Sequence, residues 1–499
     1  MSAASVSLIV MFSLVAAGTG VGFLAGRRRV MDLEQWVVGG RRLGAVLVFL
    51  LMAGEAFTTF SFLGASGWAY SRGGPTLYIL AYLPLAEIVG FFILPQIWEL
   101  GKRTGMQTQP DFFAWRYGNR YLAGLVCLVG IGSFIPYIQL QITGLGLIAS
   151  ITSFGGIGRD AAMIGAVGLL VAFVFANGIR AIAWVSVVKD GLMLLAAVAI
   201  GIGIPLIHFG GVGPMFATLA RLHPGHLTMP GGTKDLGHAW YVSTVLLSAL
   251  GGFMWPHLFG SAFTAKSADA LRRNFMVLPL YNLVLVLIFI AGFAALVAVP
   301  GLPDGDLALL TVVRQTFPPW FLGLVGGAGA LTAMVPAAVF TLTAATLFAK
   351  NLVRPLIAPG MSDAAVGRLA RAMVIVIGGV SLYLALFSSK TLVGLLLIGY
   401  AGVAQFFPGV LFGLYWRRIT ARSVLAGIVA GIVVASFLML TDRNPFLGID
   451  AGFVGLCANF AVVLLLTLLE PALGWRGRAP LAAEAELFGA AGGERRVPR

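Results

Sequence analysis

Long apolar runs separated by short polar segments make up most of this chain of 499 residues. About 20 consecutive apolar residues are enough for a helix to cross a lipid bilayer. The runs are continuously apolar rather than alternating, so they favour helices over the strands of a membrane barrel. The pattern predicts an all-α polytopic membrane protein with thirteen transmembrane helices, at residues 5–25, 44–70, 75–100, 119–153, 158–177, 180–207, 240–262, 275–300, 320–349, 367–387, 391–415, 421–441 and 450–470.

The composition supports this interpretation and excludes a water-soluble enzyme. Hydrophobic residues account for 59% of the chain and charged residues for 10%, whereas a soluble domain carries about a quarter charged residues. A net charge of +14 would suggest nucleic-acid binding in a soluble protein. Here the basic residues lie between apolar runs, so membrane topology explains them and we expect no nucleic-acid partner. The two cysteines, Cys127 and Cys457, lie in apolar runs and provide no disulfide framework or metal-ligand spacing.

The distribution of basic residues also predicts an orientation. If the N-terminus is outside, 25 of the 33 Lys and Arg residues fall in cytoplasmic segments and seven in outer ones. Cytoplasmic loops carry such an excess, which supports an odd number of spans and a cytoplasmic C-terminus. The first run has no basic segment before it and is followed by Arg27, Arg28 and Arg29, so we expect it to be retained rather than cleaved as a signal peptide.

Motifs of ATP-driven pumps and of membrane enzymes are absent from the sequence. It contains no G-x-x-x-x-G-K-[ST] loop that would bind ATP, and no H-E-x-x-H or G-x-S-x-G motif. We therefore expect a transporter that uses an ion gradient, with no enzymatic activity and no cofactor beyond the coupling ion. A transporter-like sensor is a distant alternative.

Three carboxylates fall inside predicted spans, where charge is costly and therefore suggests function. Asp190, next to Lys189, belongs either to an interfacial pair near a helix end or to a functional pair. Glu87 is either a structural residue bonded between helices or a functional one. Glu55 indicates function most strongly, because it lies among small and hydroxylated residues of the second run, which include Gly54, Thr58, Thr59 and Ser61.

Two of the runs have the composition of a discontinuous helix. In the second run, the segment around Glu55 would unwind and free carbonyls for a cation and N–H groups for an anion; a small-residue packing face is the alternative. In the seventh run, Gly251 and Gly252 permit unwinding and Pro256 removes a backbone donor. Because these runs lie five spans apart, two five-helix halves would have opposite topologies, as in an inverted repeat with its substrate near the bilayer midplane.

Other polar side chains in the runs need hydrogen-bond partners within the membrane. Gln139 and Gln141 lie in the fourth run and Gln405 in the eleventh. Their partners are either a substrate or neighbouring helices. His257, beside Pro256, is either a proton carrier or ligand donor, or a packing histidine.

Several motifs are spread over about residues 30–430: Trp36-x-x-Gly39-Gly40-Arg41-Arg42-Leu43-Gly44, Phe62-Leu63-Gly64-Ala65-Ser66-Gly67, Thr108-Gln109-Pro110-Asp111-Phe112 and Gln405-Phe406-Phe407-Pro408-Gly409. With these motifs the chain resembles the sodium:solute symporter family, which includes proline, pantothenate and sodium/glucose transporters. Glu55-Ala56-Phe57-Thr58-Thr59-Phe60, Phe253-Met254-Trp255-Pro256-His257 and Met334-Val335-Pro336-Ala337-Ala338 are most similar to bacterial monocarboxylate permeases.

The resemblance implies a leucine-transporter-like, inverted-repeat core in the bacterial inner membrane, with broken second and seventh helices. We expect four parts: an N-terminal extra helix with the first cytoplasmic loop (1–43), a ten-helix transport core (44–416), two C-terminal helices (417–470) and a cytoplasmic, disordered tail (471–499).

The resemblance also implies positions for a sodium site. In this family the site joins backbone carbonyls of the first core helix, here at Gly54 and Phe57, to the eighth core helix, where Ala333 is a further candidate position. The family's hydroxyl pair falls at Pro336 and Ala337, whose side chains cannot bind sodium, although hard cations need about five or six oxygen ligands.

Other residues would then have to provide the coupling. Thr341 and Thr343 lie one to two turns further along and are candidates to replace the missing hydroxyls. Alternatively the coupling ion is H⁺, carried by Glu55 or His257, because both can titrate when buried. The expected coupling ion is therefore H⁺ or Na⁺.

The function that the sequence favours is import of a small organic anion by symport, with a monocarboxylate such as lactate, pyruvate, acetate or propionate as the substrate. A Na⁺-coupled symporter for an amino acid such as proline, or for another nutrient, is the alternative. Helix N-termini at the breaks would bind the carboxylate. The residues expected to line the substrate site are Thr58, Thr59, Ser61, Gln139, Trp255, His257 and Gln405.

Overall fold

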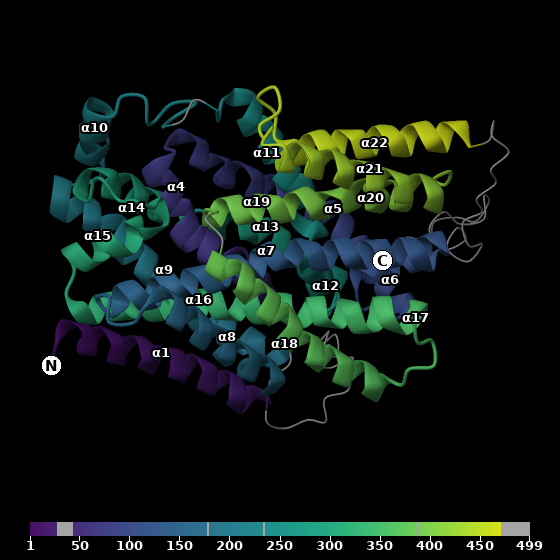
Figure 1. Cartoon of the computed structure of the whole chain (residues 1–499), viewed down its shortest axis with the longest axis horizontal. Coiled ribbons are helices and arrows are strands. Elements are labelled where there is room, and N and C mark those ends of the chain that lie inside the picture. The colour runs from purple at the N-terminus through teal and green to yellow at the C-terminus, as the bar shows by residue number, and fades with distance from the viewer. Residues whose placement is uncertain (27–42, 177–178, 233–234, 388–389, 471–499) are drawn as a thin grey trace.

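The computed structural model describes residues 1–26, 43–176, 179–232, 235–387 and 390–470, without the side chains of 25–26, 55–56, 176 and 179–181. These residues form a bundle of helices that run side by side along the long axis (Figure 1). The elements are α1 (Ala3–Gly26), α3 (Ala45–Ala56), η2 (Phe60–Gly64), α4 (Ala65–Ser71), η3 (Gly74–Leu77), α5 (Tyr78–Thr104), α6 (Gln109–Tyr117), α7 (Arg120–Thr152), α8 (Arg159–Ala176), α9 (Ile179–Phe209), α10 (Val212–Leu222), α11 (His238–Gly251), η4 (Gly252–Met254), α12 (Pro256–Ala262), α13 (Ala268–Asn282), α14 (Val284–Ala298), η5 (Gly305–Leu307), α15 (Ala308–Thr316), α16 (Pro319–Thr346), η6 (Leu347–Val353), α17 (Arg354–Leu356), α18 (Asp363–Phe387), α19 (Leu392–Val403), η7 (Ala404–Phe406), α20 (Phe407–Tyr415), α21 (Ala421–Leu440) and α22 (Ala451–Leu469).

The described part of the chain contains ten helices long and apolar enough to cross a membrane, or eleven if the bent pair α11–α12 is one span. A shorter apolar helix covers Ala45–Gly54. The chain is therefore a multi-pass membrane protein. The full count of thirteen spans and the inverted repeat stay predictions.

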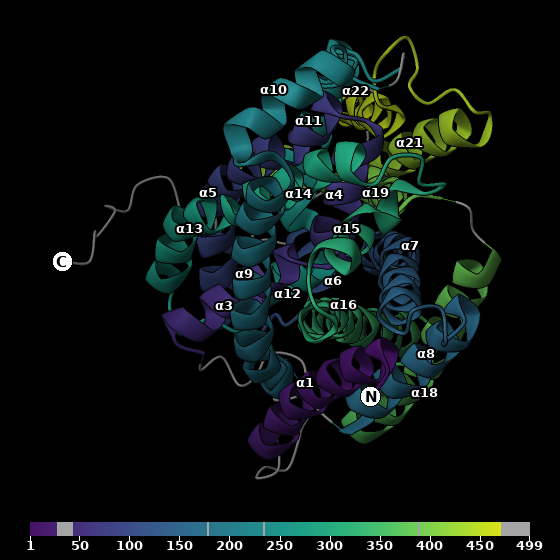
Figure 2. The same cartoon turned by 90° about the vertical axis from the view of Figure 1, so that its left-hand side faces the viewer.

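Helix α16 lies at the centre of the bundle, and its glycines allow the closest contacts with its neighbours. In the end-on view of Figure 2 it lies between α1, α7 and α9, and it packs against all three. A Cβ atom on Gly323 would lie 2.4 Å from the Ser7 carbonyl oxygen, and one on Gly326 would lie 2.4 Å from the Thr152 methyl group. Small residues let membrane helices approach this closely, so α16 forms the core of the bundle.

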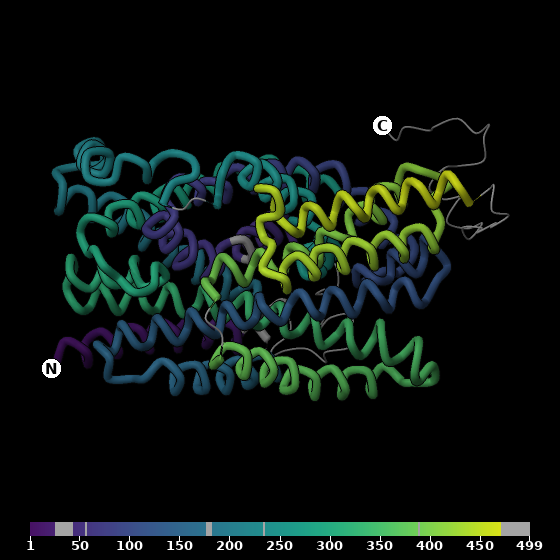
Figure 3. Tube along the Cα trace, turned by 45° about the horizontal axis from the view of Figure 1, so that its top comes forward, coloured from purple at the N-terminus to yellow at the C-terminus, as the bar shows by residue number. Residues whose placement is uncertain are grey.

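The C-terminal helices form a separate layer. Helices α21 and α22 pack against each other and lie side by side along one flank of the bundle (Figure 3). Helix α10 lies at the same end of the molecule as the N-terminus, whereas α6 and α17 lie at the opposite end (Figure 1). The polar connections between spans therefore collect at the two ends.

Regular α-helical geometry is interrupted in both regions where the sequence contains helix-breaking patterns. Helix α3 ends at Ala56, Phe57 is extended (φ −92°, ψ 95°), and the chain re-enters a helix through the π-helical turn η2. Helices α11 and α12 are bent by 50°, with Trp255 extended between them (φ −59°, ψ 126°). Pro256 accounts for the second bend, because a proline disfavours helical geometry in the preceding residue. The broken character of the two membrane spans themselves stays a prediction.

Candidate functional site

A cavity of about 50 Å³ lies at the bend between α11 and α12. By the same measure one water molecule needs about 10–15 Å³, so the cavity has room for a few waters or a solute of similar size. Residues of α3, η2, α5, α7, η4, α12, α13 and α19 line it, together with Trp255: Met52, Phe60, Tyr82, Leu83, Ala86, Glu87, Tyr137, Gly252, Phe253, Trp255, His257, Leu258, Leu278 and Tyr400.

Six of the fourteen residues that line the cavity are phenylalanine, tyrosine or tryptophan. The Trp255 ring lies 4.9 Å from Tyr137 and 5.5 Å from Tyr400, and Tyr400 lies 5.7 Å from Tyr82, measured between ring centroids. The indole fits because residue 399 is glycine: a Cβ atom there would lie 2.5 Å from Trp255 Cη2. Besides these aromatic faces, the indole N–H and the phenol hydroxyl groups can form hydrogen bonds in the cavity, as can His257 and Glu87.

His257 lies in the wall of this cavity and is buried. Its ring packs 4.5 Å from Phe340 and 5.4 Å from Phe134. Within the part of the chain that the structure describes, neither ring nitrogen has a hydrogen-bond partner. Because an unpaired buried polar group is costly, this arrangement favours a ligand-binding role for His257 over a purely packing role.

Glu87, on α5, is the acidic residue of the cavity wall. One of its carboxyl oxygens accepts a 2.7 Å hydrogen bond from the Asn282 amide on α13. The other, Oε2, is buried with no hydrogen-bond partner among the described residues. Glu87 therefore links two helices, as a structural residue would, and also lines the cavity with one carboxyl oxygen unpaired among the described residues.

The hydroxylated segment after α3 is buried, but its side chains serve the interrupted backbone. Ser61 Oγ accepts from the Thr58 N–H at 2.9 Å and donates to the Thr58 carbonyl at 2.9 Å. The Phe60 N–H donates to Thr58 Oγ1 at 3.2 Å. Thr58, Thr59 and Ser61 are not among the described residues lining the cavity, whereas Phe60 is. The structure therefore gives Thr58 and Ser61 a capping role at the start of η2.

The glutamines of the predicted site have different partners. Gln139 donates to the Leu384 carbonyl on α18 at 3.4 Å. Gln405 donates to the Gly452 carbonyl on α22 at 3.4 Å and accepts from Asn459 at 3.1 Å. Both therefore bond to neighbouring helices rather than line the cavity. Gln141, which we did not place in the site, accepts from the Thr59 N–H at 3.2 Å.

The carbonyl groups predicted for a sodium ion are occupied by a lysine. Lys189, on α9, is completely buried, and its Nζ donates to the Gly54 carbonyl at 2.5 Å and to the Phe57 carbonyl at 3.0 Å. The Asp190 carboxylate lies 3.1 Å from the same nitrogen. The interpretation of Lys189–Asp190 as an interfacial pair near a helix end is therefore wrong, because the pair is buried against the interruption after α3.

Among the described side chains, the remaining ion-coupling candidates supply no further oxygen to this interruption. Thr341 donates its hydroxyl to the Ala337 carbonyl one turn earlier on α16, at 2.7 Å. Ala333, Pro336 and Ala337 are buried, and their side chains carry no oxygen. The Glu55 side chain lies outside the described residues. The described residues at these positions thus do not fit the sodium site that the resemblance implies.

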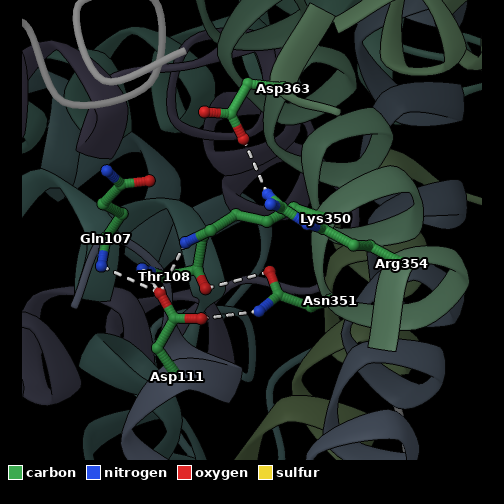
Figure 4. A network of polar contacts seen from close by, with 7 residues as sticks. All are labelled: Gln107, Thr108, Asp111, Lys350, Asn351, Arg354 and Asp363. Carbon is green, nitrogen blue, oxygen red and sulfur yellow. Dashed lines mark hydrogen bonds and ion pairs between the residues drawn. The ribbon is translucent and has the colours of Figure 1, made fainter. Parts of the chain in front are cut away.

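A polar network at one end of the bundle fixes the short helix α6 (Figure 4). Asp111 accepts from the N–H groups of Gln107 and Thr108 at 2.9 and 3.0 Å, and both Lys350 and Asn351 donate to it at 2.7 Å. Burial alone would raise the pKa of Asp111, but the Lys350 ammonium and these hydrogen bonds outweigh it and lower that pKa. The carboxylate therefore links α6 to η6 as an ion.

Helix α6 also contacts the bend beside the cavity. Gln109 donates to the Met254 carbonyl in η4 at 2.8 Å, and Tyr117 donates to the Gly409 carbonyl in α20 at 2.6 Å. A second, smaller cavity of about 20 Å³ lies between Gln107, Thr108 and the η6 end of α16, and His257 lines it as well. His257 thus separates the central cavity from a space next to α6.

Sequence patterns missed two features of this region. The tyrosines Tyr82, Tyr137 and Tyr400 line the cavity, yet an aromatic residue in an apolar run gives no signal of its own. Lys189 could be recognised as unusual, because a lysine within an apolar run is costly. Its contact with the Gly54 carbonyl could not be predicted, because the two residues are far apart in the sequence.

Comparisons with known proteins agree with this architecture. A sequence model described as the sodium:solute symporter family matches residues 36–431. Two uncharacterized symporters of Bacillus subtilis strain 168, YhjB and YodF, are 43% and 34% identical over 93% of this chain and over 97% and 93% of their own lengths. A monocarboxylate transport permease of Rhizobium johnstonii is 28% identical over 93% of this chain and 96% of that protein.

Solved structures resemble the whole fold. A Na⁺-coupled sialic acid symporter in a substrate-bound outward-open state has a TM-score of 0.79 at 18% identity, over 93% of this chain and 98% of that one. Mhp1, a nucleobase-cation-symport-1 family transporter in a closed conformation, has a TM-score of 0.58 at 14% identity. That match covers 93% of this chain and 98% of the Mhp1 chain. At these identities the likeness concerns the fold alone.

Proposed function

Because this chain belongs to the sodium:solute symporter family, we propose that it is a secondary symporter that imports a small monocarboxylate, coupled to H⁺, with Na⁺ as the alternative coupling ion. The observation that carries this proposal is the size and lining of the central cavity. A space of about 50 Å³ suits a solute of a few heavy atoms, such as acetate, propionate, lactate or pyruvate. The monocarboxylate permease among the relatives supports the same substrate class.

The chemistry of the cavity wall suits a short carboxylate with an apolar tail. The Trp255 indole N–H, the tyrosine hydroxyls and the His257 ring can donate hydrogen bonds to a carboxylate. The aromatic faces would surround a methyl or ethyl group. We therefore keep Trp255 and His257 as substrate-binding residues and add Tyr82, Tyr137 and Tyr400.

Of Thr58, Thr59 and Ser61, we keep Thr59 as a candidate substrate-binding residue. Its Oγ1 is buried without a hydrogen-bond partner among the described residues. Thr58 and Ser61 would act indirectly, by holding the backbone turn that brings Phe60 into the cavity wall. Gln139 and Gln405 would act as helix-packing residues.

Glu87 is the residue we assign to the coupling proton. A bound carboxylate would face the unpaired Oε2 of Glu87 across a small apolar cavity. Two carboxylates that share such a site cannot both ionise without a large cost, so binding favours one shared proton. The substrate and one proton would then move together. Glu55, whose side chain is not described, stays a second proton-carrying candidate, and the N-terminus stays assigned to the outside.

Counterflow exchange in proteoliposomes tests the substrate class without any ion gradient. Vesicles loaded with unlabelled lactate, pyruvate or propionate should transiently accumulate the labelled form of the same solute, and vesicles without protein should not. Exchange of proline with no exchange of any monocarboxylate would refute the proposed substrate and support the amino-acid alternative.

A further inference from the structure

We infer that the Lys189 ammonium group is a built-in replacement for the cation at the interruption after α3, so that transport proceeds without Na⁺ at this position. Only the transport test of this inference rests on the proposed function. The inference itself is based on two hydrogen bonds of Lys189 to residues more than 130 positions away in the chain.

Lys189 reaches the carbonyl groups that the broken helix leaves free. Because α3 ends at Ala56 and Phe57 is extended, the carbonyl oxygens near this point lack the usual helical donors. Nζ donates to two of them, on Gly54 and Phe57. A single positive charge therefore bridges both sides of the interruption, as a coordinated metal ion would.

The pocket around the ammonium is filled and its charge is balanced. The Asp190 carboxylate, 4% exposed, lies 3.1 Å from Nζ. A Cβ atom on Gly54 would lie 3.2 Å from Nζ and 3.3 Å from Asp190 Oδ2. On the Gly54 side, this close packing leaves no room for a second cation with an oxygen shell of its own.

The facing helix lacks the other half of a sodium site. Sodium would need further oxygens from α16, but Pro336 and Ala337 offer no side-chain oxygen, and the Thr341 hydroxyl donates to its own helix. An ammonium group needs only three acceptors, and two carbonyls with one carboxylate provide them. The donor set thus matches lysine and does not match a free metal ion.

The first test measures sodium binding by the full-length purified protein, without any need for transport. We expect the melting temperature of the wild type to be the same in NaCl and in choline chloride of equal ionic strength. Lys189→Ala opens the carbonyls and leaves Asp190 uncompensated, so Na⁺ should raise the melting temperature of this variant specifically, by about 2 °C or more. Lys350→Ala, which removes a different paired lysine, should show no such response.

A second test uses counterflow exchange in sodium-free buffer. Wild-type exchange should be equal with and without Na⁺, whereas exchange by Lys189→Ala should require Na⁺. If the Lys189→Ala variant does not fold, the wild-type measurements still test whether Na⁺ binds this protein and is needed for exchange. Na⁺-specific stabilisation of the wild type, or an exchange that requires Na⁺, would overturn the inference, and so would a folded Lys189→Ala protein indifferent to Na⁺ in both tests. Absence of exchange for every solute would refute the proposed function, and the melting experiment would still test Lys189.

Discussion

At the scale of single residues, the position of the Trp255 indole depends on a glycine of another helix. A Cβ atom at position 399 would lie 2.5 Å from Trp255 Cη2 and 3.0 Å from the Ser133 carbonyl oxygen. Gly399→Ala should therefore displace the indole and raise KM for the monocarboxylate about tenfold, since one methylene in a pocket changes affinity by 10- to 200-fold. Gly379→Ala on α18, which meets nothing within 4 Å, is the matched control. An unchanged KM in a folded Gly399→Ala protein would remove Trp255 from the site.

Glu87 has a role that can be separated from substrate binding. Glu87→Gln keeps the hydrogen bond to Asn282 but cannot release a proton. We expect this variant to retain counterflow exchange. Its rate of uptake driven by a proton gradient should fall at least about tenfold. Glu99→Gln, at a half-exposed position, should leave both activities unchanged. Full proton-driven uptake by Glu87→Gln would assign the proton to another group.

Gln405 illustrates a polar residue whose partner is a helix. Gln405→Ala removes its bonds to Gly452 and leaves the buried Asn459 side chain with one partner fewer. The expected result is a loss of about 1–2 kcal/mol of stability, with KM unchanged. The double variant with Asn459→Ala should lose less than the sum of the two single changes. A raised KM with unchanged melting temperature would instead return Gln405 to the substrate site.

These residues also show how far the sequence could define the site. Trp255 and His257 follow from the Gly–Gly and Trp–Pro–His pattern, because local backbone chemistry determines where that helix bends. The roles of the Thr58 and Ser61 hydroxyl groups could not be predicted in this way, since a hydroxyl at a helix break can bind either a ligand or its own backbone. Contacts such as Lys189 with Gly54 depend on how distant helices pack, which one sequence does not specify.

At the scale of elements, α6 connects the cavity region to one end of the bundle. It contacts η4 through Gln109, η6 through Asp111 and α20 through Tyr117. The short helix lies between two predicted spans, and its apolar content is too low for the run-length pattern to reveal it.

The Asp111 network can be tested against an exposed ion pair of the same region (Figure 4). Asp111→Asn should lower stability by about 2 kcal/mol, because it weakens charge-assisted hydrogen bonds of a mostly buried carboxylate. Asp363→Asn removes the exposed pair with Arg354 and should change stability by less than about 0.5 kcal/mol. Thermal melting of both variants checks this, and equal effects would contradict a central role for α6.

The lowered pKa of Asp111 fixes the pH dependence of that difference. Because its pKa in the folded protein lies below the ordinary 3.8, the stabilisation is fully present above about pH 4. It is lost only as the pH falls through the lowered value. The difference in stability between wild type and Asp111→Asn should therefore be constant from pH 8 to pH 5. If the difference in stability disappeared between pH 7 and pH 5, the pKa of Asp111 would not be lowered by Lys350.

At the scale of the whole molecule, the family fold is retained, and we infer that Lys189 replaces its cation. The family model covers residues 36–431 and the sialic acid symporter matches the fold with a TM-score of 0.79. The apolar pattern was sufficient to predict a multi-pass helical membrane protein, because bilayer thickness limits span length directly. It could not reveal the contact between Lys189 on α9 and the end of α3, on which our inference about the coupling ion depends.

Concentrative uptake by proteoliposomes tests the central claim most directly. Labelled lactate, pyruvate and propionate would be offered under an inward proton gradient without Na⁺, and separately under an inward Na⁺ gradient at equal pH. The account predicts accumulation with the proton gradient alone and none with the Na⁺ gradient alone. Accumulation that requires the Na⁺ gradient would contradict it, and would mean that sodium binds this chain despite Lys189.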